Sequence, residues 1–143
     1  MIPNRRIVAQ WHLPHQFAAS DTFSRRNINQ SIDESMTAYA SVTRAALAAG
    51  MRVRAYLSTV FGCPFEGDVP IGTVAALTRR LIEMGAYEVA LSDTIGIAHP
   101  GQIGPVLEAV TRNVPLPQIA MHFHDTRGTA LVNVYAALEA GCC

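Results

Sequence analysis

The chain has 143 residues, with 11 Lys and Arg against 11 Asp and Glu, so its formal net charge is zero. Half of the residues are hydrophobic and 15% are charged, which is enough apolar sequence for a packed core. The balanced charge argues against a nucleic-acid-binding protein, because such a protein needs a basic surface to contact phosphates. We find no apolar run of membrane-spanning length and no secretory signal, so we expect no membrane segment.

The three cysteines give no sign of a disulfide framework. Cys142 and Cys143 are adjacent, and Cys63 stands alone in a loop rich in glycine and proline. We assign Cys63 no catalytic role, because nothing nearby in the sequence lowers the pKa of its thiol. This usage of cysteine predicts a protein of the reducing cytoplasm.

From residue 31 onward, the hydrophobic pattern alternates between helical and strand spacing. Ser31 and Glu34 form a capping-box pattern at the start of a helix that Gly50 is placed to end. Three strands are predicted, at residues 53–58, 87–92 and 119–124. The later helices carry apolar residues on one side, namely Val74, Leu77, Leu81 and Met84; Ile103, Val106, Leu107 and Val110; and Leu131, Val134, Tyr135 and Leu138.

Each strand and the helix after it form a unit of roughly 30 to 35 residues, the size of a βα crossover unit. Successive units of this kind predict a parallel sheet, and in a closed (β/α)8 barrel the chemistry lies in the loops after the strands. Such a barrel takes about 250 residues. We therefore predict an α/β fold that is a partial (β/α)8 TIM barrel, about half of the barrel with three to four βα units.

The start of the chain departs from this pattern. Residues 17–19 form at most the stub of a fourth strand. Residues 11–16 contain histidines and a proline where a buried strand would need Val and Ile, and Pro14 would remove a hydrogen-bond donor from the sheet. We therefore predict an atypical leader over residues 1–17 and a partial barrel domain over residues 18–143.

The strongest chemical signal is the pair His122 and His124 at the predicted end of the last strand. Because side chains alternate along a strand, both imidazoles point to the same face and can converge on one ion. A hydrogen-bonded pair with a structural role is the alternative. The position at a strand end, followed by Asp125 and Thr126, favours a metal site, and imidazoles with a carboxylate suit a hard or borderline divalent cation.

Polar side chains also end or line the other predicted strands. Asp93 ends the middle strand, where its carboxylate could orient a metal-bound water or a substrate hydroxyl, or could cap the following turn. Arg54, Tyr56 and Ser58 share one face of the strand at residues 53–58. Arg54 could bind a carboxylate or phosphate of a ligand, or form a salt bridge inside the barrel, and the sequence leaves both alternatives open.

Four blocks of sequence, in this order and spacing, resemble the hydroxymethylglutaryl-CoA lyase family. They are Ser-Asp-Thr-Phe-Ser-Arg-Arg-Asn-Ile-Asn at 20–29, Gly-Cys-Pro-Phe-Glu-Gly at 62–67, Ser-Asp-Thr-Ile-Gly at 92–96 and His-Phe-His-Asp-Thr at 122–126. The resemblance covers about residues 18 to 141. Related condensing enzymes, such as isopropylmalate, citramalate and homocitrate synthases, share the His-x-His strand but usually continue with Asn-Asp, where this chain has Asp-Thr.

The resemblance implies a metal-dependent lyase that cleaves hydroxymethylglutaryl-CoA to acetyl-CoA and acetoacetate, in leucine breakdown and ketone-body formation. His122 and His124 match the two histidine ligands of a Mg²⁺ or Mn²⁺ ion. Asp93 matches an acidic residue close to that site, which we expect to be catalytic, and Arg54 and Tyr56 match positions lining the substrate cavity. The implied partner is an acyl-CoA substrate.

The chain also departs from the family's pattern. The family's first-strand Arg-Asp pair and second-strand Glu are absent, and its glycine-rich cysteine loop and following Asn ligand would lie beyond Cys143. We expect at most weak metal binding and no turnover from this chain alone, because the missing carboxylate reduces charge complementarity for a hard cation. The alternatives are a related condensing enzyme, or a non-catalytic fragment that forms a homo-oligomer through its two unpaired sheet edges.

Overall fold

In the computed structural model, which describes residues 13–142, four parallel strands form one sheet in the order β1-β2-β3-β4. The strands are β1 (Leu13–Ala18), β2 (Val53–Ser58), β3 (Glu88–Asp93) and β4 (Ile119–Phe123). Each strand lies beside the strand that precedes it in the sequence, as consecutive βα units require. This arrangement confirms the predicted α/β fold with a parallel sheet.

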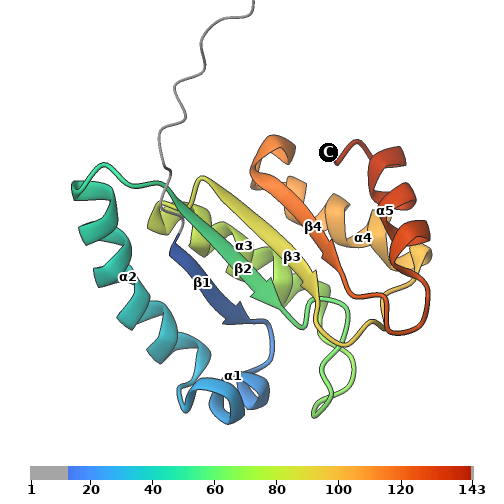
Figure 1. The fold of residues 1–143 in the computed structure, drawn as a ribbon, viewed down its shortest axis with the longest axis horizontal. Helices are drawn as coiled ribbons and strands as arrows, with labels where there is room; N and C mark the ends of the chain where they lie inside the picture. The colour runs from blue at the N-terminus through green and yellow to red at the C-terminus, as the bar shows by residue number, and fades with distance from the viewer. Residues whose placement is uncertain (1–12, 143) are drawn as a thin grey trace, which may run out of the picture.

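The helices cover one face of the sheet and its two sides. They are α1 (Asp21–Ile28), α2 (Ile32–Ala48), α3 (Ile71–Met84), α4 (Pro100–Thr111) and α5 (Ala130–Glu139), with a short 3-10 turn at Leu116–Gln118. Figure 1 shows α3 and α4 behind the sheet, α2 beside β1 and α5 beside β4. The face of the sheet turned toward the viewer is therefore free of helices in this view.

The strand β2 shows why one face of the sheet is core and the other is polar. Its residues alternate, so Val53, Ala55 and Leu57 are fully buried toward the helices. Arg54 and Tyr56 lie on the opposite face and are half-buried. The period-two pattern of the sequence thus placed both faces correctly.

Two predicted helix signals are confirmed in atomic detail. The hydroxyl of Ser31 accepts the Glu34 backbone N–H (3.2 Å) while the Glu34 carboxylate accepts the Ser31 N–H (2.7 Å), which completes the capping box of α2. Gly50 follows the end of α2 with φ of 75°, a left-handed conformation that favours glycine.

The start of the described chain differs from the prediction. β1 is a full strand over Leu13–Ala18, whereas the sequence predicted only a stub at residues 17–19. Pro14 lies inside this strand, in register with Arg54 of β2. Among the described residues β1 is an edge strand, and an edge is where a sheet tolerates proline. The strand runs across the boundary that we placed between residues 17 and 18.

The last helix also packs differently from its predicted stripe. The apolar side chains that we predicted on one side of this helix are exposed, namely Leu131 (82%), Val134 (43%), Tyr135 (60%) and Leu138 (55%). Asn133 and Ala137 are buried instead. The reason is that α5 packs against α4 and β4 at the end of the layer, and no described element lies on its outer side.

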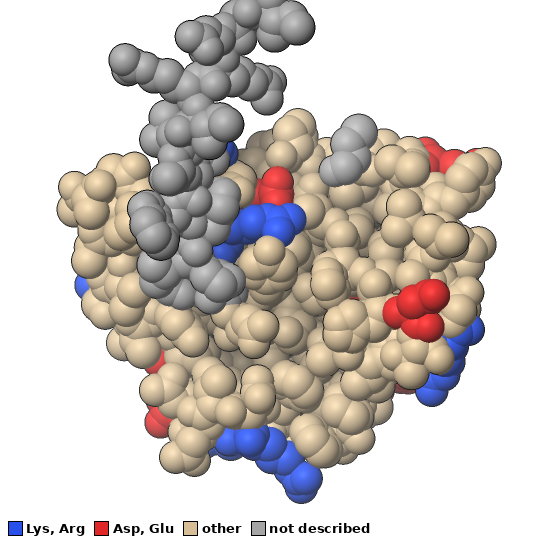
Figure 2. Space-filling view, viewed as in Figure 1, with Lys and Arg blue, Asp and Glu red and all other residues tan. Residues whose placement is uncertain are grey.

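The surface carries few charges on the face in view. Figure 2 shows small groups of both signs scattered over a mainly uncharged face. Within residues 13–142, no helix is long and apolar enough to cross a membrane.

Candidate metal and ligand site

A cavity of about 330 Å³ lies at the carboxyl ends of the strands. Its floor comes from three neighbouring strands: Tyr56 and Ser58 of β2, Ser92 of β3, and His122 of β4. His124, which directly follows β4, also lines the cavity. The strand alternation that buries the helix-facing side chains therefore brings these polar groups together on the open face.

The two histidines meet at this cavity, as the His-x-His spacing predicts. Their ring centroids are 5.0 Å apart and the rings are inclined by 72°. Nδ1 of His124 lies 2.8 Å from the carbonyl oxygen of Thr94. Because a carbonyl can only accept, Nδ1 is assigned the proton, and Nε2 keeps the lone pair that a metal ion needs.

The environment of His122 also favours a neutral imidazole. Burial lowers the pKa of His122 below its usual value, and the neighbouring His124 and the Arg54 guanidinium lower it further, while Asp93 opposes them. This shift favours the unprotonated ring of His122, which is the form that binds metal.

The donor set fits a divalent cation only in part. His122 and His124 can supply two imidazole ligands. Among the residues that the structure describes, no group of three or more His, Cys, Asp and Glu side chains is placed to hold a metal ion. A hard cation such as Mg²⁺ prefers carboxylate oxygens, so the two imidazoles are half of a site rather than a complete one.

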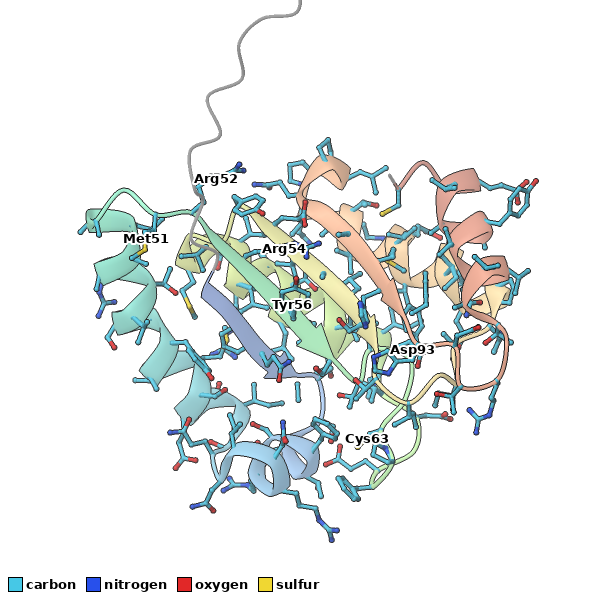
Figure 3. The ribbon with its side chains drawn as sticks, viewed as in Figure 1. Met51, Arg52, Arg54, Tyr56, Cys63 and Asp93 are labelled. Atoms are coloured by element: carbon cyan, nitrogen blue, oxygen red, sulfur yellow. The ribbon has the colours of Figure 1, made fainter. Side chains whose placement is uncertain are left out.

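Asp93 lies where β3 ends (Figure 3), but its carboxylate turns away from the cavity. The side chain is 1% exposed, and its two oxygens accept the backbone N–H groups of Ile97 (3.0 Å) and Ala98 (3.1 Å). Of the two alternatives that the sequence left open, the structure shows the one in which Asp93 caps the turn. The same turn begins with Thr94, whose carbonyl holds His124.

Arg54 and Tyr56 project from the open face of β2 (Figure 3). Arg54 forms an ion pair with Glu88 of β3 and donates a hydrogen bond to the hydroxyl of Tyr56. The structure thus shows the salt-bridge alternative for Arg54, while Tyr56 lines the cavity. Sequence reasoning missed Glu88, although a charged residue at the start of the neighbouring strand was the signal that could have found it.

Several lining residues were not predicted from the sequence, and three of them come from the start of the described chain. Gln16 comes from β1, and Phe23 and Asn27 come from α1. Phe23 and Asn27 are four positions apart, which places them on one face of a helix. Recognising Ser20 as a helix N-cap would have predicted α1. The four-residue spacing would then have placed Phe23 and Asn27 on one face of that helix.

The turn after β3 packs closely against the segment after β4. Asn133 donates to the carbonyl of Ala98 (2.9 Å), and Arg127 donates to the carbonyl of Gly96 (3.3 Å). Gly96 has φ of 67°, and a Cβ atom there would lie 2.8 Å from Cβ of Thr126. The two segments that hold His124 therefore fit together without spare room.

Four consecutive βα units with a polar cavity at the carboxyl ends of the strands define this chain as part of a (β/α)8-barrel protein. The HMGL-like family model matches residues 12–143, and the chain belongs to this family.

The relatives agree with the resemblance seen in the sequence. The hydroxymethylglutaryl-CoA lyase of Bacillus subtilis is 52% identical over 124 residues, which are 87% of this chain and 42% of that protein. A Pseudomonas aeruginosa protein described as a 3-hydroxy-3-isohexenylglutaryl-CoA/hydroxymethylglutaryl-CoA lyase is 49% identical over 124 residues, 87% of this chain and 41% of that one. The chain thus spans about two fifths of the length of these curated relatives.

A solved structure gives the same result for the fold. The crystal structure of hydroxymethylglutaryl-CoA lyase from P. aeruginosa superposes with a TM-score of 0.89 and 46% identity, covering 92% of this chain and 44% of that one. The predicted partial TIM barrel is therefore confirmed.

Proposed function

We propose that this chain carries the metal- and substrate-binding strands of a hydroxymethylglutaryl-CoA lyase, which cleaves 3-hydroxy-3-methylglutaryl-CoA to acetyl-CoA and acetoacetate. The observation that carries the proposal is the convergence of His122 and His124 on a cavity at the strand ends. Relatives that are 52% and 49% identical and are described as such lyases support it.

In this proposal His122 and His124 hold a divalent cation, Mg²⁺ or Mn²⁺. When bound, such a cation supplies Lewis-acid stabilisation of negative charge on substrate oxygens. The Thr94 carbonyl orients His124 by accepting from Nδ1. Asp93, which we expected from the sequence to be catalytic, acts in this geometry as a positioning residue, because it holds the turn that carries Thr94.

The remaining cavity residues suit a polar acyl group. The hydroxyls of Tyr56, Ser58 and Ser92 can hydrogen-bond to the hydroxyl and carboxylate of a glutaryl-CoA substrate. Arg54 is neutralised by Glu88 and donates to the Tyr56 hydroxyl, so its part is to orient that hydroxyl rather than to bind an anion directly. An acyl-CoA is thus the proposed partner, and cytoplasmic location stays a prediction.

We expect this chain by itself to bind metal weakly and to show no turnover. The described residues offer two imidazoles at the cavity and no clustered carboxylate beside them. Losing an anionic ligand weakens a site for a hard cation most, because that ion depends on charge neutralisation by oxygen ligands.

A titration with Mn²⁺, measured by calorimetry, tests the proposal on the wild-type chain and on the double variant His122→Ala/His124→Ala. The control is His99→Ala, because His99 is an exposed histidine at the start of α4, outside the cavity. We expect weak binding by the wild type and the control, and its loss in the double variant, with matching circular dichroism spectra. Binding that persists in the double variant, or a folded wild type that binds no Mn²⁺, would contradict the proposal.

A further inference from the structure

One side chain in the cavity differs in kind from the others. Among the described residues that line it, Phe23 is the one whose side chain has no polar atom. The others are hydroxyl, amide and imidazole side chains. An alkyl group of a ligand gains free energy by leaving water where it meets apolar surface. The ring of Tyr56 also lines the cavity, but its hydroxyl accepts from Arg54, so Phe23 is the wholly apolar side chain among the described lining residues.

The backbone of Phe23 is fixed by two side chains at the start of α1. The Ser20 hydroxyl accepts the Phe23 N–H (3.1 Å), and the Glu66 carboxylate accepts the Thr22 N–H (2.8 Å). These bonds satisfy two of the donors that a helix leaves unpaired at its N-terminus. Glu66 belongs to the loop after β2, so a second segment of the chain holds this turn in place.

The ring of Phe23 is also supported from outside the cavity. The ring of Phe65, in the same loop as Glu66, lies 6.1 Å from it between centroids, and Cζ of Arg26 lies 4.4 Å from the centre of the Phe65 ring. Sγ of Cys63 lies 3.0 Å from the hydroxyl oxygen of Ser20. The loop at residues 62–67 therefore lies against the Phe23 ring and holds the turn that carries it.

We propose that Phe23 is a specificity-determining residue, whose ring contacts the alkyl substituent on C3 of a 3-hydroxy-3-alkylglutaryl-CoA and limits the size of that substituent. The inference rests on the proposed function. The hydroxyl and carboxylate of such a substrate match the polar part of the cavity, and among the described lining residues Phe23 is the wholly apolar side chain that an alkyl group can contact. Substituent size varies within the family, since the P. aeruginosa relative is described as acting on both isohexenyl and methyl compounds.

The experiment compares two probes, 3-hydroxy-3-methylglutaryl-CoA and 3-hydroxy-3-isohexenylglutaryl-CoA, by NMR titration of the full chain. Mg²⁺ is present because it is diamagnetic. We expect Phe23→Ala to weaken the binding of the methyl compound about fourfold, which corresponds to the burial of one methyl group. The binding of the isohexenyl compound should stay unchanged or become tighter. Phe23→Leu keeps an apolar side chain and the fold. Its ratio of the two dissociation constants should lie between those of the wild type and Phe23→Ala.

The control is Tyr135→Ala, because Tyr135 is an exposed aromatic residue on α5, outside the cavity. It should leave the ratio of the two dissociation constants within twofold of the wild type. If both Phe23 variants also leave that ratio unchanged although the wild type binds, the role of Phe23 is overturned while the proposed function stands. If the folded wild type binds neither probe, the proposed function and this inference both fail.

Discussion

Asp93 shows which properties of a single residue can be predicted from the sequence and which cannot. Its place at the end of a strand was predictable from the Leu-Ser-Asp-Thr pattern. Its direction was not, because direction depends on which residue of β3 lies beside which residue of β4. In the structure Ser92 pairs with His122, which puts Ser92 on the face of the sheet that lines the cavity. Asp93 pairs with Phe123 on the opposite, helix-covered face.

Replacing Asp93 with Asn should destabilise the fold. Asn keeps one acceptor oxygen and places an NH₂ group where the second backbone N–H of the turn now finds an acceptor. We expect a loss of about 1–3 kcal/mol in the free energy of unfolding, measured by urea denaturation.

Asp33→Asn is the matched control for this change. The side chain of Asp33 is 82% exposed and pairs with Arg80 on the surface, so its loss should lower stability by less than about 1 kcal/mol. Equal losses in the two variants would mean that the turn does not depend on the Asp93 carboxylate.

At the scale of elements, the sequence predicted β2, β3 and β4 and the helices between them to within a few residues, because each combines a clear period with a glycine or capping signal. β1 and α1 were missed or shortened, because Pro14 and the polar Ser20–Asn29 segment conceal them. The apolar stripe predicted on α5 is exposed rather than packed against another element. A helical period shows which side of a helix is apolar, but it does not show whether another element lies there to cover it.

The close fit between the segments after β3 and β4 makes Gly96 sensitive to a single methyl group. Gly96→Ala adds a Cβ atom 2.8 Å from Cβ of Thr126 and keeps a left-handed φ. We expect a loss of about 2–4 kcal/mol in unfolding free energy, from backbone strain and overpacking together. The NMR signals of Thr126 and His124 should shift as the segment moves.

Gly50→Ala separates the two causes. Gly50 has φ of 75° but has no atom within 4 Å of an added Cβ, so it reports the backbone strain alone, about 1–2 kcal/mol. If Gly96→Ala costs no more than Gly50→Ala, the segments are less tightly packed than the structure indicates.

At the scale of the whole molecule, the described chain has two open boundaries. β1 and β4 are the edges of its sheet, and strand edges offer unpaired backbone groups to other chains. Beside β4, α5 exposes an apolar surface made of Leu131, Val132, Val134, Tyr135 and Leu138. An exposed apolar surface next to a free edge favours association, and the homo-oligomer expected from the sequence stays a prediction.

Association should therefore depend on α5. We expect the wild-type chain to form dimers or larger species as its concentration rises, measured by light scattering after size-exclusion chromatography. Leu131→Lys/Leu138→Lys should shift the population toward monomers, because two charges would lie in the apolar surface.

Val42→Lys serves as the comparison, since Val42 is 42% exposed on α2, at the other side of the sheet. It should leave the association unchanged. A monomeric wild type, or equal association of all three chains, would remove α5 as the contact surface.

Because the strands lie in the sheet in the same order as in the chain, the protein can assemble in the direction of its synthesis. As each strand is synthesised, its partner in the sheet is already present: β1 for β2, β2 for β3 and β3 for β4. A nascent chain that ends before residue 119 already contains the strands and helices that form most of the cavity, including the turn with the Thr94 carbonyl. His122 and His124 belong to β4 and the residue after it, so the imidazole pair is the last part of the described cavity to be synthesised.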